Sequence, residues 1–254
     1  ANVSERDRLG IGEDRKTRIS VIKANKIIPK VVAVVSSEGT YTVPRTCPVC
    51  GEATELFLSK GEVRFLRCTN ADCPAKNIKK FARFVSKHGV DIDGISIESL
   101  RDFVDAGFVK TFPDIFRLEA HREALEQMPG FGAKSVDKLI TALHRARTGV
   151  DPVKLINALC IPQIGLDAAK KLVTACGWEG FLTRLRAGAP FVDIDGLGEE
   201  RSSAIRSWYE KRENRDMLEE LLGLVDVTPT EAKAQGGGSC EGLTFVITGN
   251  VHTF

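Results

Sequence analysis

Four cysteines in two close pairs constrain the fold of this chain more than any other feature. Cys47 and Cys50 form a C-x2-C pair, and Cys68 and Cys73 form a C-x4-C pair. A tetrahedral zinc ion needs four thiolates that converge on one point, and two tight cysteine turns joined by a β-hairpin can supply them. The sequence therefore predicts a structural zinc site, closed to substrates and without chemistry of its own.

The residues between the two pairs fit this geometry. Residues 55–58 and 63–67 are short β-prone runs, and the turn at 59–62 contains a glycine. Two alternatives stay open, namely two disulfides or a redox C-x-x-C motif. The other cysteines are an odd, scattered set, and no apolar run approaches the ~20 residues of a membrane span, so we expect a reducing, cytoplasmic compartment. Those cysteines are Cys160, Cys176 and Cys240.

A net charge of +2 hides an asymmetry between the two halves of the chain. Residues 1–90 carry 17 Lys and Arg against 9 Asp and Glu, whereas the remainder carries 19 against 25. The basic first part favours a polyanionic partner. In the acidic second part, any contact with nucleic acid must come from backbone groups more than from a basic patch.

Residues 1–44 are predicted to be β-structure. Residues 18–22 alternate between polar and apolar side chains, and residues 27–35 are a second apolar run. Two or three strands cannot close a small barrel, so this segment is predicted to be the last part of one. At the junction between the two strands, two lysines stand beside two isoleucines, which suits either a solvated turn or a contact surface. These four residues are Lys23, Lys26, Ile27 and Ile28.

An amphipathic helix is predicted from Pro74 to Lys87. Its apolar residues fall on one face, and five basic residues without an interleaved acid form the other. The basic face suits either simple solvation or contact with phosphates. Gly89 ends the helix.

Residues 90–210 contain an internal repeat of four helix–loop–helix segments. The loops carry a G-h-G pattern or a variant of it, where h is apolar, and their first loop positions are 36, 33 and 33 residues apart. Short helical runs follow each loop at residues 98–103, 134–143, 167–173 and 200–208. The loops are Gly94-Ile95-Ser96, Gly130-Phe131-Gly132, Gln163-Ile164-Gly165 and Gly196-Leu197-Gly198.

A loop of this kind can bind an anion without a basic side chain. The glycines permit a tight turn with positive φ, the apolar residue packs back into the helix pair, and successive N–H groups then point at one spot beside a helix N-terminus. The plain alternative is a helical bundle with glycine caps. Ser96 and Gln163 each replace one glycine, so the second and fourth loops, with Lys134 beside the second, are the better candidates for phosphate contact.

Two further segments close the sequence. Residues 228–240, with a proline and three consecutive glycines, are predicted to be a flexible linker. Residues 241–254 begin with a β-prone run ending in Thr-Gly, which predicts the first strand of another domain, truncated at Phe254. This strand cannot fold alone.

Taken together, this order of parts resembles the C-terminal half of bacterial NAD-dependent DNA ligase. Local sequence at 27–29, 46–50, 91–94, 129–132 and 244–249 supports the resemblance. It implies a multi-domain chain: the C-terminal part of an OB-fold at 1–44, a four-cysteine zinc finger at 45–74, an all-α helix-hairpin-helix domain at 75–227, the linker, and the beginning of an α/β BRCT domain at 241–254.

The resemblance also implies a function. Members of this family adenylate a lysine with NAD and Mg²⁺ and seal nicks in duplex DNA during replication and repair, and the lysine lies in a K-x-D-G motif. No K-x-D-G occurs in this sequence. We therefore expect a monomeric DNA-clamping part of the enzyme, inactive alone. Its expected DNA contacts are Lys23, Lys26, Ile27, Ile28, Gly94, Gly130, Phe131, Gly132, Lys134, Gly165, Gly196, Leu197 and Gly198.

Two other classes of function remain compatible with the residues alone. Tandem helix-hairpin-helix and zinc modules also occur in non-catalytic DNA scaffolds and accessory modules of repair nucleases. A protein-interaction module built on the BRCT start is the third possibility. The coding sequence upstream of Ala1 would distinguish these classes, because only the ligase requires a K-x-D-G domain.

Overall fold

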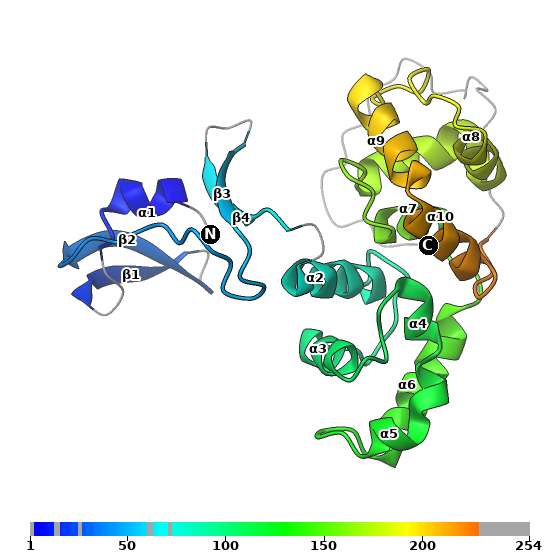
Figure 1. Cartoon of the computed structure of the whole chain (residues 1–254), viewed down its shortest axis with the longest axis horizontal. Helices are drawn as coiled ribbons and strands as arrows, with labels where there is room; N and C mark the ends of the chain where they lie inside the picture. The colour runs from blue at the N-terminus through cyan, green and yellow to red at the C-terminus, as the bar shows by residue number, and fades with distance from the viewer. Residues whose placement is uncertain (1–2, 13–15, 25–26, 60–62, 71–72, 229–254) are drawn as a thin grey trace, which may run out of the picture. The chain divides into compact units, whose positions relative to one another are not determined.

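A computed structural model describes residues 3–12, 16–24, 27–59, 63–70 and 73–228. The chain divides into two compact units, residues 1–78 and 79–254 (Figure 1). The predicted BRCT start, the predicted linker beyond Thr228, and Lys26 lie outside the described residues.

The first unit contains one short helix and two β-hairpins. Helix α1 spans Val3–Leu9, and strands β1 (Arg18–Ala24) and β2 (Ile28–Ser36) pair antiparallel. Strands β3 (Thr54–Leu58) and β4 (Arg64–Cys68) form the second antiparallel pair (Figure 1). Both predicted hairpins are confirmed within about two residues, but the prediction of β-structure throughout 1–44 is wrong at α1. Its polar sequence, VSERDRL, carries no strand alternation, and an acid–base pair between Glu5 and Arg8 supports the helix.

Contacts within the first unit join its two hairpins through α1. Helix α1 packs against β2 and β4. Arg64 of β4 donates a hydrogen bond to Asp7 at 2.6 Å, and its backbone N–H donates to the Ser4 hydroxyl at 2.7 Å. Arg6 stacks over the Tyr41 ring at 4.2 Å. Polar and cation–π contacts therefore connect α1 to the rest of the first unit, where a larger domain would use an apolar core.

Helix α2 (Pro74–Val85) begins where the predicted helix begins and crosses the boundary between the units. Its predicted apolar face is confirmed, because the side chains of Ile78, Phe81, Phe84 and Val85 are all buried. Gly89 then follows the helix, and a Cβ at this position would collide with the carbonyl oxygens of Arg83 and Phe84.

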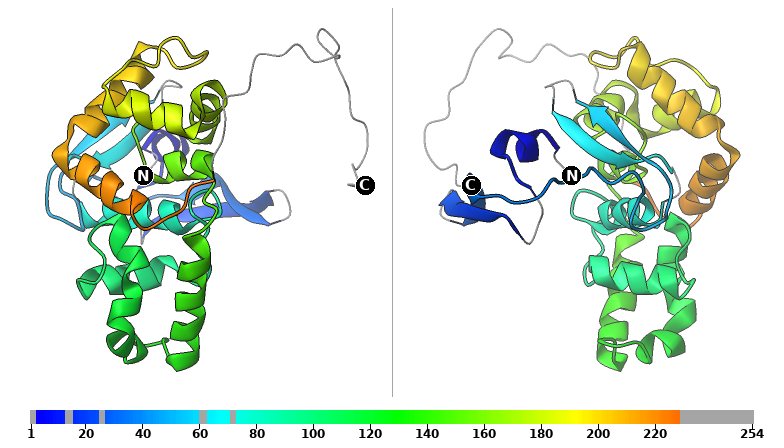
Figure 2. Two further views of the ribbon diagram at one scale, coloured as in Figure 1. Left: turned by 90° about the vertical axis from the view of Figure 1, so that its right-hand side faces the viewer. Right: turned by 60° about the vertical axis from the view of Figure 1, so that its left-hand side comes forward.

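The second unit is a helical domain. After α2 come α3 (Ile97–Asp105), α4 (Phe112–Phe116), the 3-10 helix η2 (Leu118–His121), α5 (Arg122–Glu126), α6 (Ala133–Ala146), α7 (Pro152–Ala158), α8 (Leu166–Arg186), α9 (Glu199–Glu210) and α10 (Arg212–Leu222). Figure 2 shows α3–α6 and α7–α10 as two groups of helices within this unit. Helix α10 follows the last predicted helical run and lies within the helical domain expected at 75–227, with Leu218 and Leu221 buried.

One continuous apolar core fills the helical domain. It runs from Phe81 to Val225 and includes fully buried aromatic side chains such as Phe103, Phe116 and Phe181. The end of the described chain returns to the middle of the domain, where Val150 pairs with Val227 in a parallel bridge. The Val150 N–H donates to the Asp226 carbonyl at 2.9 Å, and the Asp226 N–H donates to the Arg147 carbonyl at 2.7 Å. This return ties α10 to the α6–α7 connection.

Candidate functional site

The four predicted zinc ligands come together in the first unit. Their sulfur atoms all lie within 4.8 Å of one another, with Sγ–Sγ distances of 3.9 Å for Cys47–Cys73 and 3.5 Å for Cys50–Cys68. Tetrahedral coordination with Zn–S bonds of ~2.3 Å places sulfur atoms about 3.8 Å apart. A disulfide needs about 2.05 Å, and all four cysteines are free thiols, so the disulfide alternative is wrong. The donor set therefore fits Zn²⁺.

The backbone around the cysteines prepares this site. The Cys47 N–H donates to the Glu52 carbonyl at 2.7 Å, and the Gly51 N–H donates to the Cys47 carbonyl at 2.9 Å. Gly51 adopts φ = 74°, a conformation that glycine adopts at little cost. Cys73 precedes α2, and its carbonyl accepts the N–H of Lys76 at 2.8 Å. The Lys76 ammonium also donates to the Cys68 carbonyl at 2.8 Å, so one residue links α2 to the second cysteine pair.

The thiols differ strongly in acidity when no metal is bound. Hydrogen bonds from the backbone N–H groups of Cys50 and Val49 lower the pKa of Cys47 to about 6. Desolvation raises the pKa of Cys68 to about 12. A bound Zn²⁺ ion holds all its cysteine ligands as thiolates, so metal binding must release protons and tighten as the pH rises.

The four repeated loops share one backbone conformation. The first residue of each has positive φ, with values of 85° at Gly94, 83° at Gly130, 64° at Gln163 and 76° at Gly196. The third residue is extended and serves as the N-cap of the following helix, in the order Ser96, Gly132, Gly165 and Gly198. The prediction of a positive-φ turn is therefore confirmed at the first position. The glycine at the third position has negative φ, so backbone strain does not explain its presence.

The glycine at the third position leaves the backbone of the loop accessible. A Cβ at Gly132, Gly165 or Gly198 would meet no atom within 4 Å, so each of these positions opens on to space. For the described residues, no hydrogen bond donated by the N–H of Gly132 or Gly198 is found. These groups stand where an anion can approach the N-terminus of α6 or α9.

The middle residue of each loop anchors it to the helices. Ile164 and Leu197 are buried, and Ile95 and Phe131 are half-buried and pack against the core. The N–H of Phe131 donates to the Met128 carbonyl at 3.0 Å, and that of Leu197 donates to the Ile194 carbonyl at 2.9 Å. Phe131 and Leu197, expected at a DNA interface, therefore support their loops from within more than they present a side chain to a ligand.

The first loop differs from the others for a visible reason. The Ser96 hydroxyl accepts the N–H of Ser99 at 3.0 Å, so a side chain already occupies the N-terminus of α3. The second loop has no acid in the first turn of α6 and carries the exposed Lys134. The fourth has Glu199 and Glu200 in the first turn of α9. The ranking of the loops from sequence used the glycines and Lys134, and it did not consider Glu199 and Glu200.

The predicted contacts in the β1–β2 hairpin also gather at one place. Lys23 pairs with Pro29, and the turn follows directly, with the Ile27 N–H donating to the Ala24 carbonyl at 3.2 Å. Ile27 is 81% exposed and Ile28 is 59% exposed. Exposed isoleucines at a hairpin tip favour a contact surface over core packing.

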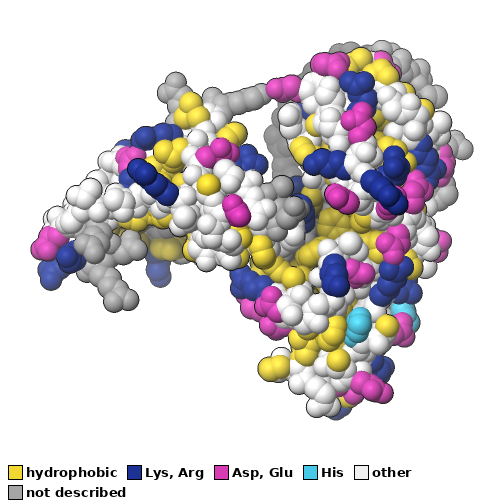
Figure 3. Space-filling view, viewed as in Figure 1, with side chains coloured by type: hydrophobic (Ala, Val, Ile, Leu, Met, Phe, Trp, Pro, Cys, Tyr) yellow, Lys and Arg dark blue, Asp and Glu magenta, His cyan; other side chains and the backbone are white. Residues whose placement is uncertain are grey.

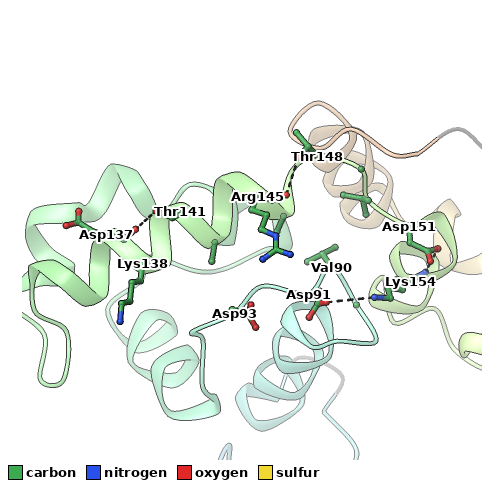
Figure 4. Close-up of a pocket in the computed structure, with 15 residues that line it drawn as sticks. Val90, Asp91, Asp93, Asp137, Lys138, Thr141, Arg145, Thr148, Asp151 and Lys154 are labelled. Atoms are coloured by element: carbon green, nitrogen blue, oxygen red, sulfur yellow. Dashed lines mark hydrogen bonds and ion pairs between the residues drawn. The ribbon is translucent and has the colours of Figure 1, made fainter. Parts of the chain in front are cut away.

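Charges of both signs are mixed on the visible face of the helical domain. On the face of this unit seen in Figure 3, Lys and Arg side chains are interspersed with Asp and Glu. The same mixture lines a cavity of about 560 Å³ next to the start of the first loop, where Asp93, Lys138 and Arg145 are among the lining residues and Asp91 pairs with Lys154 at 4.0 Å (Figure 4). Such a surface favours backbone contacts with a polyanion over a broad electrostatic attraction. In the part of the chain that the structure describes, no helix is both long and apolar enough to cross a membrane.

Comparisons with known proteins agree with both sites. A family model described as the NAD-dependent DNA ligase C4 zinc finger domain matches residues 46–75, and one described as a SAM-like helix-hairpin-helix tandem matches residues 90–145. A DNA ligase of Lachnoclostridium phytofermentans is 34% identical over 97% of this chain, and one of Hyphomonas neptunium is 32% identical over 98%. The chain spans 37% and 38% of these two relatives. The chain is therefore similar to the part of NAD-dependent DNA ligases that contains the zinc finger and the helix-hairpin-helix tandem.

Proposed function

We propose that this chain is the DNA-binding part of an NAD-dependent DNA ligase that seals nicks in duplex DNA. The single observation that carries the proposal is the pair of open glycines, Gly132 and Gly198, each at the N-terminus of a long helix with its backbone exposed. Backbone N–H groups bind phosphate without reading bases, so binding is independent of sequence, prefers duplex and weakens with salt.

The zinc finger serves as a joint in this proposal. Its closed four-cysteine site does no chemistry, and it stands between the β1–β2 hairpin and α2 along the chain. We assign residues 1–44 to the last part of an OB-fold, whose tip residues Lys23, Ile27 and Ile28 press against the minor groove. The BRCT start at 241–254 remains a prediction from sequence. NAD and Mg²⁺ would serve an adenylation domain carrying K-x-D-G, a motif that this sequence does not contain.

The test replaces the open glycines. Gly132 and Gly198 have φ of −100° and −60° with extended ψ, so valine fits both positions without backbone strain or a collision. Its branched side chain would cover the neighbouring N–H groups. We expect Gly132→Val and Gly198→Val together to weaken binding to a labelled nicked duplex at least tenfold at fixed salt, while the circular dichroism of the bundle stays unchanged.

The control is Ala187→Val, an exposed position at the C-terminus of α8, which adds the two γ-methyl groups of valine away from the loops. Unchanged affinity in the double glycine variant would refute the proposal. The scaffold alternative is not favoured, because the relatives that match almost the whole chain are named DNA ligases. The DNA ligase of Ruminiclostridium cellulolyticum is a further example, 30% identical over 97% of this chain.

A further inference from the structure

The fourth loop receives a cation from another repeat. Lys171 lies on α8, the helix that follows the third loop, and its ammonium group sits so close to Gly196 that a Cβ there would collide with it. The same ammonium lies 3.7 Å from the carboxylate of Asp195, the residue just before the fourth loop. Arg201 of α9 donates a hydrogen bond to the Gly196 carbonyl at 2.6 Å and holds the loop from its other side.

The repeat explains why a side chain reaches across in this way. Lys171 stands six residues after the last loop position, Gly165, and the equivalent residues in the other repeats are Asp102, Lys138 and Ala204. The residue directly after this position is buried in all four repeats, so the position lies at the edge of the packed face. In the first pair of loops, Asp102 and Lys138 line one cavity together with Gly130 and Gly94. The position therefore lies beside the loop of the neighbouring repeat in both pairs.

The second and fourth loops differ in where their nearest cation comes from. The second loop has its own cation in Lys134, but the neighbouring repeat places the carboxylate of Asp102 in the cavity beside it. The fourth loop begins a helix with Glu199 and Glu200, which repel phosphate. It therefore needs a cation, and Lys171 supplies one.

In this structure, the carboxylate of Asp195 lies beside Lys171, where a phosphate group would bind. The Asp195 side chain is fully exposed and its contact with Lys171 is long, so solvent screens the pair and weakens it. A phosphate can displace such a carboxylate at little cost. Beside the pair, Lys170 and Thr174 line a cavity of about 690 Å³ between α8 and the loop, which leaves room for a strand to approach.

We propose that Lys171 is a phosphate-contacting residue of the fourth helix-hairpin-helix loop, donated by the helix of the third, and that Asp195 holds it ready in the absence of DNA. The inference rests on the proposed function. It makes the third and fourth repeats one composite site: the third contributes a side chain, and the fourth contributes backbone N–H groups.

The experiment measures binding of the whole 254-residue, zinc-loaded chain to a labelled nicked duplex over a range of salt concentrations. Each phosphate contact contributes about 0.9 to the slope of log K against log salt concentration. Lys171→Gln should therefore lower the magnitude of that slope by about 0.9 and weaken binding about eightfold at 0.1 M salt, if the contact contributes nothing at 1 M salt. Lys211→Gln, an exposed lysine between α9 and α10, is the charge-matched control and should change the slope by much less.

A second variant separates binding from simple support of the loop. If Lys171 only braces the loop through Asp195, then Lys171→Gln and Asp195→Asn should weaken binding alike. If Lys171 binds phosphate, Asp195→Asn should strengthen binding, because it removes the competing carboxylate. A slope unchanged by Lys171→Gln, or weaker binding by Asp195→Asn, overturns the inference.

The two proposals fail in different ways. If the unaltered chain does not bind the duplex, or if the double glycine variant binds as well as the unaltered chain, the proposed function fails. If the glycine variant binds weakly while Lys171→Gln behaves like Lys211→Gln, only the inference about Lys171 fails. Thermal unfolding of each variant should show that all of them fold.

Discussion

The two compact units of this chain are stabilised in different ways. In the helical unit, one apolar core runs through every helix and buries whole aromatic side chains. In the first unit, among the described residues before α2, the buried hydrophobic side chains are Val3, Cys47 and Cys73 alone. Its strands instead expose apolar residues on their surfaces: Ile19, Val21, Ile22, Val32, Val35, Leu56, Phe57, Leu58 and Phe65.

This difference shows what a metal does for a small fold. The zinc finger, matched at residues 46–75, is too short to bury enough apolar surface to offset the entropy of ordering its chain, so it needs a metal or disulfides. The four thiols around one point thus take the place of an apolar core in that part of the first unit. The helical unit has no need of a metal, and the two cysteines that the structure describes there, Cys160 and Cys176, are single half-buried thiols whose pKa values desolvation raises.

The largest expected effect is the loss of zinc. Structural zinc in small domains contributes on the order of 10–16 kcal/mol, so a chelator should open the finger while the helical unit stays folded. Hydrogen exchange should show lost protection at 46–68 and unchanged protection in α6 and α8, together with a metal assay. Cys73→Ser should act like the chelator, and Cys176→Ser is the control. Loss of protection in both units together would refute the independence of their stabilities.

Acidification should release the same metal more gradually. Protons compete with Zn²⁺ for the thiolates, so affinity should fall as the pH is lowered. Cys68 should contribute to this dependence over the whole range, because its pKa, raised to about 12, means that Zn²⁺ must displace a proton from it. Cys47, whose pKa is lowered to about 6, should contribute mainly below that pH. Competition with a zinc indicator over a range of about pH 5 to 8 measures this pH dependence of the zinc affinity. Affinity independent of pH would contradict thiolate coordination.

A core substitution should destabilise the helical unit and leave the zinc site intact, whereas zinc removal should do the opposite. Phe181 is fully buried and stacks near Trp178 and Phe191, at centroid distances of 5.9 and 5.8 Å. Phe181→Ala should lower the free energy of unfolding of the helical unit by about 3–5 kcal/mol, since it leaves a cavity. The zinc content should not change. Val192→Ala, at an exposed position close in sequence, is the control, and equal effects of the two would contradict the role of the core.

A buried hydroxyl offers a smaller test within the same unit. The Ser202 side chain is completely buried and accepts the N–H of Phe191 at 3.0 Å. Ser202→Ala leaves that N–H without its partner and should cost about 1–3 kcal/mol. Ser203→Ala, one residue further along α9, removes a less buried hydroxyl that bonds Glu199 and should cost much less. Chemical denaturation compares the two variants, and equal costs would contradict the assignment.

The smallest effect should come from surface ion pairs. Arg186 bonds Glu219 at 2.7 Å with both side chains over 40% exposed, and it lowers the pKa of Glu219. A double-mutant cycle should give a coupling of about 0–1 kcal/mol. Because the folded pKa lies below the ordinary value of 4.5, the contribution is present above pH 4.5 and is lost as the pH falls through the folded pKa. A coupling that persisted well below that range would contradict an ionic origin.

Features that depend on local chemistry could be predicted from the order of the residues. Cysteine spacing defined the zinc ligands, because two tight turns and a hairpin leave four sulfur atoms few other arrangements. The G-h-G pattern defined the loops, because positive φ at Gly94, Gly130 and Gly196 is costly for most other residues. Even Gln163, which broke the pattern, adopts the loop conformation, so the repeat context overrides the preference of one residue.

Which residues of a neighbouring repeat lie beside each loop depends on the tertiary packing. Lys171 is 25 residues from Gly196 in the sequence, and nothing in its neighbourhood marks it as different from Lys170. The pairing of repeats brings its ammonium to the fourth loop, just as packing against the core orders α10 and the bridge from Val150 to Val227. Local residue types determine which conformations a segment can adopt at low cost. Contacts between distant segments depend on how whole helices pack, and short sequence patterns do not encode that packing.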